Sequence, residues 1–486
     1  MSFDAGPTHR DTVRSDDARR PTWPRLALAT LCTAVLIAQL DTSVVNLGVR
    51  PIGQSFRVGV DTLQWVVDGY NLTYAASLLT AGLLADLYGR RLVFTIGAAL
   101  FCGASLICAS APAVSVLIAG RALAGVGAAL LLPASLSIIR VAWPDPQQRA
   151  RALGIWAGCN GLAFAIGPTI GGLLIDRFGW RSVFLVVVPV GLAALCAAPW
   201  TVPESSDPRH RDFDAGAQVP GALALACLCV AAIESARAVQ VAAVALAVAI
   251  VSLILFLRIE RSKGPSALVP LDLFSVREFR ASVIATCGMT FGMYGTVFLL
   301  PLTWQSAGGL GPIEAGIALT PMACVFLAVS PFSGPLVARL GSRLMTAGGV
   351  SIIGCGLLVI GLSADRTSLA AAETGLMLTG VGMGLATGPL MGAAVGSVPA
   401  ERSGTAASVI NVARMAGATI GVAALGAVFA ASGGGSRGLS HALLLGSLSQ
   451  LAAAAVAWRI TAGRRAARAA AAPMVAPVKR AARRGR

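Results

Sequence analysis

Long apolar segments recur along almost the whole chain and constrain its fold more than any other feature. Hydrophobic residues make up 56% of the 486 residues and charged residues only 12%, whereas soluble domains carry about 25% charged residues. One water-soluble chain cannot bury this much apolar surface, and each segment is close to the roughly 20 residues that cross a bilayer as a helix. The sequence therefore predicts an all-α integral membrane protein with fourteen spans, near residues 26–48, 63–83, 92–110, 113–137, 151–175, 182–201, 219–236, 238–258, 280–303, 313–335, 345–364, 368–394, 404–430 and 440–459.

The seventh and eighth segments leave the number of spans open. Both are rich in Ala and Val, and only Ala236 and Arg237 separate them. Twelve or thirteen spans are therefore alternatives to fourteen.

The distribution of basic residues predicts the orientation of the chain in the membrane. If both termini lie in the cytoplasm, 29 of the 38 Lys and Arg residues fall on cytoplasmic segments, 7 on outer loops and 2 inside the membrane. This asymmetry follows the positive-inside rule. The net charge of +16 is thus explained by a multi-pass protein of the cell membrane, without a nucleic-acid partner. The Arg-rich C-terminal tail is interpreted as a topology anchor that contacts anionic lipid.

A repeated loop predicts the internal organisation. Gly82 and Gly89 precede Arg90-Arg91, and Gly334 and Gly341 repeat the same spacing before Arg343. Two structural repeats around a central cavity are common in secondary transporters. We therefore expect two six-helix halves and two inserted helices, divided into a disordered cytoplasmic tail (1–25), an N-terminal half (26–201), a linker that carries both extra helices and a short amphipathic stretch around Leu271–Phe274 (202–279), a C-terminal half (280–460) and a basic cytoplasmic tail (461–486).

Several kinds of function are excluded by what the sequence lacks. The ten cysteines fall inside predicted spans and the three histidines lie far apart, so we expect no metal site, no cofactor and no catalytic cluster. The sequence has no phosphate-binding G-x-x-x-x-G-K-[ST] loop and no segment long enough for a nucleotide-binding domain. These features argue against an enzyme and against an ATP-driven pump.

The first copy of the loop carries residues with separate expected roles. Gly82 should let two helices approach closely, and Gly89 should allow a sharp reversal. Asp86 is expected to cap or pair at the start of the turn, and Arg90 and Arg91 to hold the loop in the cytoplasm.

Three charged residues within predicted spans are candidates for proton coupling. A charge at bilayer depth costs roughly 2.5–3.5 kcal/mol on insertion scales and usually faces a cavity or a partner. Asp41 is interpreted as a proton-binding carboxylate, with a structural ion pair or a hydrated interfacial position as alternatives. Arg121 does not readily lose its proton, so we predict that it tunes a nearby acid, with Asp41 the first candidate. Asp68 is either an interfacial residue or a second acid that attracts cations or protons.

The fifth predicted span is rich in small residues. Its G-x-x-x-G spacing is typical of close helix contacts, and its proline can kink the helix. The residues concerned are Gly154, Gly158, Gly167, Pro168, Gly171 and Gly172.

Taken together, these segments resemble the major facilitator superfamily and its fourteen-span drug:proton antiporter branch. The loop from Gly82 to Arg91 is similar to G-x-L-A-D-x-x-G-R-R, and the run from Leu40 to Asn46 to L-D-x-T-V-V-N with Ser43 for Thr. The segments around Asp68 and Arg121 resemble W-V-V-D-x-Y-x-L and R-x-x-Q-G-x-G-A-A, with Ala124 at the Gln position. The fifth span resembles an antiporter signature in which Ala163 replaces the inner Gly. The resemblance covers about residues 25–460.

The resemblance implies a proton-coupled secondary transporter for multidrug efflux, and hence antibiotic resistance. Its partners would be protons, the bilayer and hydrophobic or cationic small molecules, and we expect a monomer. A dedicated exporter of one endogenous metabolite or siderophore is the alternative, and a non-transporting membrane sensor is a more distant one. Six residues are candidates for the substrate cavity, although Gln305 and Asn411 are as well explained by helix–helix contacts: Asn46, Phe291, Met293, Phe298, Gln305 and Asn411.

Overall fold

A computed structural model describes residues 24–206, 215–235, 238–264, 267, 269, 271–306, 309–364, 369–399 and 402–470, with some side chains inside the helices left out. Most of the predicted N-terminal tail and most of the predicted C-terminal tail lie outside these residues, and Pro24 and Arg25 already belong to the first helix. The described part is helical and contains no strand.

The helices follow the predicted apolar segments closely. The first group is α1 (Pro24–Phe56), α2 (Val60–Tyr88), α3 (Arg90–Ser110), α4 (Val114–Ala142), α5 (Pro146–Phe178), α6 (Ser182–Leu185) and α7 (Val187–Thr201). Next come α8 (Ala215–Glu234), α9 (Val239–Lys263) and a 3-10 turn, η2 (Leu271–Ser275), at the predicted amphipathic stretch. The last group is α10 (Arg277–Ser306), α11 (Pro312–Val329), η3 (Ser330–Phe332), α12 (Ser333–Leu340), α13 (Ser342–Ser363), α14 (Leu369–Gly396), α15 (Ser403–Ala431) and α16 (Gly435–Ala470).

Twelve stretches of the described residues are long and apolar enough to cross a membrane. Two of them are broken helices: α6 and α7 share one stretch, and α11 and α12 share another around the 3-10 turn that contains Pro331. The two long helices outside this set are α2 with 29 residues and α5 with 33. Fourteen spans are therefore compatible with the structure, and the number stays a prediction.

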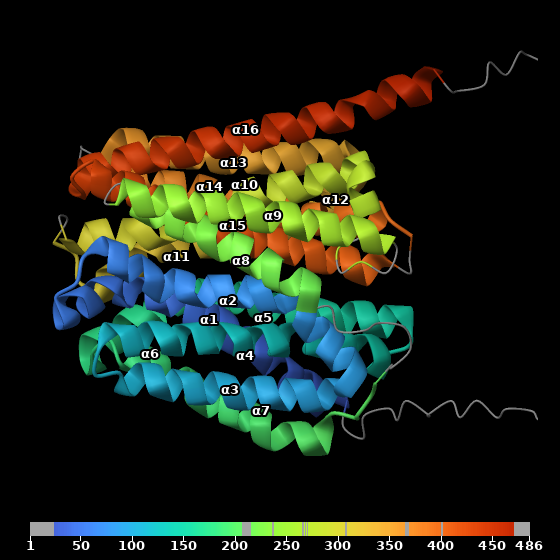
Figure 1. Cartoon of the computed structure of the whole chain (residues 1–486), viewed down its shortest axis with the longest axis horizontal. Helices are drawn as coiled ribbons and strands as arrows, with labels where there is room; N and C mark the ends of the chain where they lie inside the picture. The colour runs from blue at the N-terminus through green and yellow to red at the C-terminus, as the bar shows by residue number, and fades with distance from the viewer. Residues whose placement is uncertain are drawn as a thin grey trace, which may run out of the picture.

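The helices lie side by side along the long axis of the molecule (Figure 1). We call α1–α7 the N-terminal group and α10–α16 the C-terminal group. Two helix pairs connect the groups extensively, α5 with α11 and α2 with α15. The helices α8 and α9 pack on each other, and α8 also contacts α2 and α15, at the edge of the seam between the groups.

The two ends of the bundle are named here by their turns. The α1–α2 end also holds the turns α5–α6, α10–α11 and α15–α16, and the α2–α3 end holds the turns α4–α5 and α12–α13. At the α2–α3 end, Gly89 has φ +115° and Gly341 has φ +87°, a region that side chains rarely adopt. The sharp reversal expected at Gly89 is therefore confirmed, and Gly341 provides the same reversal in the repeat.

Candidate functional site

A buried ion pair lies inside the N-terminal group. The Arg121 Nη1 atom of α4 donates to Asp41 Oδ2 of α1 at 2.6 Å, and the two side chains are only 2% and 1% exposed. Asp41 is therefore neither interfacial nor hydrated from the bulk, and the predicted partnership with Arg121 is confirmed. A buried pair of this kind is stable only as a unit, because removing one partner leaves an uncompensated charge.

Arg121 also connects the pair to two neighbouring helices. Its Nε donates to the backbone carbonyl of Val66 in α2 at 2.9 Å. The guanidinium carbon lies 4.5 Å from the ring centre of Tyr70 and 5.9 Å from that of Phe184, within the range of cation–π attraction. One arginine thus connects α1, α2 and α6, and any change in the charge of Asp41 acts on all of them.

Asp41 keeps one free acceptor. Its Oδ1 atom receives no hydrogen bond from the described residues, and the same is true of Asn46 Oδ1 farther along α1. Because Oδ2 is occupied by Arg121, Oδ1 is the atom at which a proton can add without first displacing the guanidinium.

Asp68 occupies a different environment. Its side chain is fully buried, so the interfacial alternative is wrong. Neither carboxylate oxygen has a hydrogen-bond partner among the described residues, and Arg121 pairs with Asp41 instead. The Cys229 thiol of α8 lies within electrostatic reach of Asp68. The acid therefore lies on the side of α2 toward α8, apart from the ion pair.

The glycines in the second half of α5 pack directly on the helix that carries Asp41. A Cβ atom on Gly167 would lie 2.6 Å from Ser43 Oγ, and one on Gly171 would lie 2.6 Å from Val44 Cγ1. Real Cβ atoms do not approach this closely, so only glycine permits the contact. Ser43 and Val44 lie two and three residues after Asp41 on α1, so the close packing predicted for these two glycines is found within one helical turn of the ion pair.

The same part of α5 touches the C-terminal group. A Cβ on Gly172 would meet Pro312 O and Ile313 Cα of α11, both at 2.6 Å, and Gly316 of α11 packs on the carbonyl of Pro168. The other end of α5 is not packed in this way, because Cβ atoms on Gly154 and Gly158 would find no neighbour within 4 Å. Six residues of one sequence pattern thus divide into a contact region and an open region.

The loop between α2 and α3 is held by the end of α7. Arg91 donates to the carbonyls of Pro199 and Val202, both at 3.3 Å, and its backbone N–H donates to Glu204 Oε1 at 3.1 Å. The backbone N–H of Arg90 donates to the carbonyl of Ser205 at 2.9 Å. No role for Glu204 could be predicted from the sequence, because Glu204 lies 113 residues from Arg91 along the chain.

Two residues of this loop, Gly82 and Asp86, are expected to make close contacts. A Cβ on Gly82 would lie 3.9 Å from its nearest neighbour, Pro133 Cβ, which is ordinary van der Waals contact. The close approach expected at Gly82 is therefore wrong, since an alanine would fit. The Asp86 side chain lies outside the described atoms, so its expected pairing stays a prediction.

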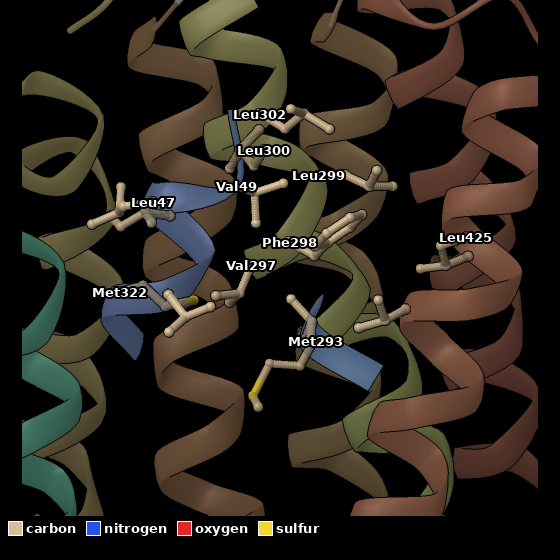
Figure 2. Packing of buried hydrophobic residues seen from close by; sticks show 14 of the residues in the cluster. Leu47, Val49, Met293, Val297, Phe298, Leu299, Leu300, Leu302, Met322 and Leu425 are labelled. Carbon is tan, nitrogen blue, oxygen red and sulfur yellow. The ribbon is translucent and has the colours of Figure 1, made fainter. Parts of the chain in front are cut away.

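The cavity candidates are mostly engaged in packing. Phe298 and Met293 belong to an apolar cluster that also contains Leu47 and Val49 of α1 (Figure 2). Phe298 is fully buried there, which leaves it no surface for a ligand in this conformation, and Phe291 packs against the same cluster. The amides make helix contacts: Gln305 donates to Leu47 O at 3.1 Å, and Asn46 and Asn411 donate to carbonyls of their own helices, Thr42 O at 2.8 Å and Ala407 O at 3.1 Å.

Sequence reasoning gave no role to several polar residues near the seam between the groups. Tyr70 stacks on Tyr74, with ring centres 6.1 Å apart, and Tyr74 lies within electrostatic reach of Arg414 in α15. Gln64 of α2 donates to carbonyls of α15. A signal was available, since amide, phenol and guanidinium groups are unusual in apolar helices, but the sequence does not name their partners. Over the described residues, no group of three or more His, Cys, Asp or Glu side chains could hold a metal ion.

Comparison with known proteins decides the family. Residues 31–422 match the model of the Major Facilitator Superfamily. The chain belongs to the major facilitator superfamily. It is 37% identical over 395 residues to the multidrug resistance protein Stp of Mycobacterium tuberculosis, covering 81% of this chain and 73% of that protein. It is 34% identical over 416 residues to the multidrug efflux pump LfrA of Mycolicibacterium smegmatis, covering 85% and 82%. The methylenomycin A resistance protein of Streptomyces coelicolor is 31% identical over 448 residues, covering 91% and 94%.

Membership of this superfamily gives the general role. The protein is a multi-pass membrane transporter that moves small molecules, and it is not an enzyme. The Asp41–Arg121 pair lies buried inside the N-terminal group of this transporter.

Proposed function

We propose that this transporter exports hydrophobic or cationic small molecules from the cell in exchange for protons. The observation that carries the proposal is the buried Asp41–Arg121 pair with one open acceptor, in contact with α2 and flanked by the glycine packing of α5 on α1. A carboxylate in this position can take up and lose a proton inside the bundle, while the arginine stays charged.

The exchange follows from the contacts of Arg121. When a proton adds to Asp41, the charge attraction at 2.6 Å is lost, while the contact from Arg121 to Val66 O and the Tyr70 ring persists. The attachment of α1 to α2 and α4 is then weakened, and a different packing of the two groups becomes favoured. Loss of the proton restores the pair. Proton binding and helix packing are therefore thermodynamically coupled, so that a change in one shifts the other.

Direction and substrate class rest on the relatives and on charge. The names of two relatives describe multidrug resistance and multidrug efflux, which supports export of varied compounds. The concentration of basic residues on the termini and on the α2–α3 end supports a cytoplasmic position for that end. Apolar contact is non-directional, so the Phe- and Met-containing interior is compatible with loose selection.

A dedicated exporter is the second candidate. Relatives named for resistance to methylenomycin A and for tetracenomycin C resistance and export favour it, since these names specify single compounds. A drug-susceptibility panel separates the candidates: a broad change in susceptibility supports multidrug export, and a change for one compound class supports the dedicated exporter.

Transport by everted membrane vesicles tests the coupling. We expect uptake of a fluorescent lipophilic cation such as ethidium into vesicles that contain the protein, and collapse of this uptake on addition of a protonophore. Vesicles with Asp41→Asn protein provide the matched control. Uptake that persists with the protonophore, or that Asp41→Asn leaves unchanged, would remove the proposed proton coupling.

A further inference from the structure

Side-chain hydrogen bonds between the two helix groups gather at one end of the bundle. Gln64 Nε2 of α2 donates to Val422 O and Ala423 O of α15, at 3.0 and 3.1 Å. Gln305 Nε2, near the end of α10, donates to Leu47 O of α1 at 3.1 Å. Thr169 of α5 and Thr320 of α11 share a hydrogen bond of 2.7 Å between their hydroxyls. All three contacts lie toward the α1–α2 end, whereas Tyr74 of α2 meets Arg414 of α15 near the middle of the bundle.

The Gln64 side chain fits closely against α15. The side chain is 1% exposed, and its amide rests against Gly426 of α15, where a Cβ atom would lie 2.7 Å from Gln64 Cδ. The missing side chain at Gly426 makes the slot that the glutamine fills. At this depth an unbonded amide would carry a large desolvation cost, so the glutamine stabilises the closed seam and penalises its separation.

The Gln305 contact closes a second side of the same seam. Gln305 is 2% exposed, and its acceptor Leu47 belongs to the apolar cluster in which α1 packs on α10 (Figure 2). The hydrogen bond therefore lies above a layer of tightly packed aliphatic side chains. Both Gln305 and Leu47 are thus buried in the contact between α1 and α10.

The opposite end of α5 lacks such contacts. Gly154 and Gly158 would accept a Cβ without meeting any neighbour, and Ile155 and Leu162 are 54% and 46% exposed. The tight contacts of α5 with α11 at Gly172 and Pro168 are confined to the α1–α2 half. The helices α5 and α11 are thus joined toward the α1–α2 end, and the opposite half of α5 stays open.

We propose that Gln64 and Gln305 are the latch residues of a gate that closes the α1–α2 end, and that the structure holds this gate shut. The identification of this end as the outer one rests on the proposed function; the gate itself rests on the contacts alone. Both latches act on helices that hold the ion pair: Leu47 lies about two helical turns beyond Asp41 on α1, and Gln64 lies just before Val66, the residue whose carbonyl accepts from Arg121. Gln64 and Gln305 are positioning residues, since their effect passes through the arrangement of helices.

A cross-linking assay reads the gate directly. Thr169→Cys and Thr320→Cys place two thiols where hydroxyls now lie 2.7 Å apart, compatible with the short reach of a disulfide. We expect rapid cross-linking of the double variant under mild oxidation in membranes, and none with either cysteine alone, which controls for the ten native cysteines. Absence of the cross-link in the double variant would overturn the closed gate.

The latch residues are then changed in this double-cysteine background. We expect Gln64→Leu or Gln305→Leu to lower the initial rate of cross-linking roughly fivefold, as for the loss of about one net hydrogen bond. Gln450→Leu is the matched control, because Gln450 is equally buried and donates to Met289 O at 3.0 Å within the C-terminal group. An equal fall in all three variants, or no fall in the two latch variants, would contradict the proposal.

A substitution in α15, opposite Gln64, gives an independent test of the gate. Gly426→Ala should lower cross-linking as Gln64→Leu does, because the new methyl group occupies the amide slot. Gly392→Ala in α14, where a Cβ would find no neighbour within 4 Å, should leave the rate unchanged. The assay needs neither a substrate nor a proton gradient, so a failure of drug export and a failure of the gate give separate results.

Discussion

The two helix groups share a scaffold but differ in what they bury. At the α2–α3 end they are alike: Arg91 binds carbonyls at the end of α7, and Arg343 binds the carbonyl of Trp458 in α16 while stacking on its ring at 3.8 Å. At the centre they differ, because the N-terminal group buries Asp41, Asp68 and Arg121, whereas α10–α16 bury no charged side chain as deeply among their described residues.

This difference gives the two groups distinct roles in the proposed transport cycle. In the proposed cycle the proton binds in the N-terminal group, where it changes the attachment of α1 to its neighbours. The C-terminal group buries Gln, Ser and Thr side chains and supplies backbone carbonyls, which do not titrate. It follows that a change of charge in one group is converted into a change of contact with the other.

Breaking the ion pair should have the largest effect. Asp41→Asn leaves Arg121 charged and without its carboxylate, which should destabilise the protein by about 3–5 kcal/mol and abolish proton-coupled export. Thermal unfolding and vesicle uptake measure the two effects. Combining Asp41→Asn with Arg121→Gln should recover much of the stability and none of the transport. Recovery of transport in the double variant would contradict the role of the pair.

Disturbing the packing beside the pair should have an intermediate effect. In Gly171→Val, the new side chain collides with Val44 on α1, and overpacking of this kind costs about 1–3 kcal/mol. In Gly158→Val, the same change is made on the same helix in open space, and stability should stay close to that of the parent. Equal melting temperatures for the two variants would show that the contact of α5 with α1 does not constrain the site.

Removing the second buried acid should have the smallest effect on stability. Asp68 has no hydrogen-bond partner among the described residues, so Asp68→Leu leaves no partner unpaired and should raise the melting temperature or leave it unchanged. If Asp68 serves transport, uptake of a lipophilic cation falls while stability holds. Destabilisation as large as that of Asp41→Asn would mean that Asp68 is a structural residue and that the contrast drawn between the two acids is wrong.

The sequence was most informative where a residue type has few options. Arg121 and Asp41 are rare charges in apolar spans, so their pairing could be predicted, and the reversal at Gly89 follows from the turn between two helices. The latch contacts could not be predicted, because the acceptors of Gln64 and Gln305 are backbone carbonyls, which every residue carries. The α5 pattern did not reveal that Gly171 is in tight contact while Gly158 faces open space, since tertiary packing decides this.

The pH dependence of gate cross-linking tests the central claim most directly. The titratable or charged groups within electrostatic reach of Asp41 are Arg121 of α4, Tyr70 of α2 and Cys108 of α3. The rate for Thr169→Cys with Thr320→Cys is measured from pH 5 to 8 with and without Asp41→Asn, and the ratio at each pH cancels the pH dependence of thiol oxidation. We predict that the ratio changes with pH, because only the protein with Asp41 gains or loses the ion pair. A ratio that stays constant across this range would contradict the claim that a proton on Asp41 controls the packing of the two groups.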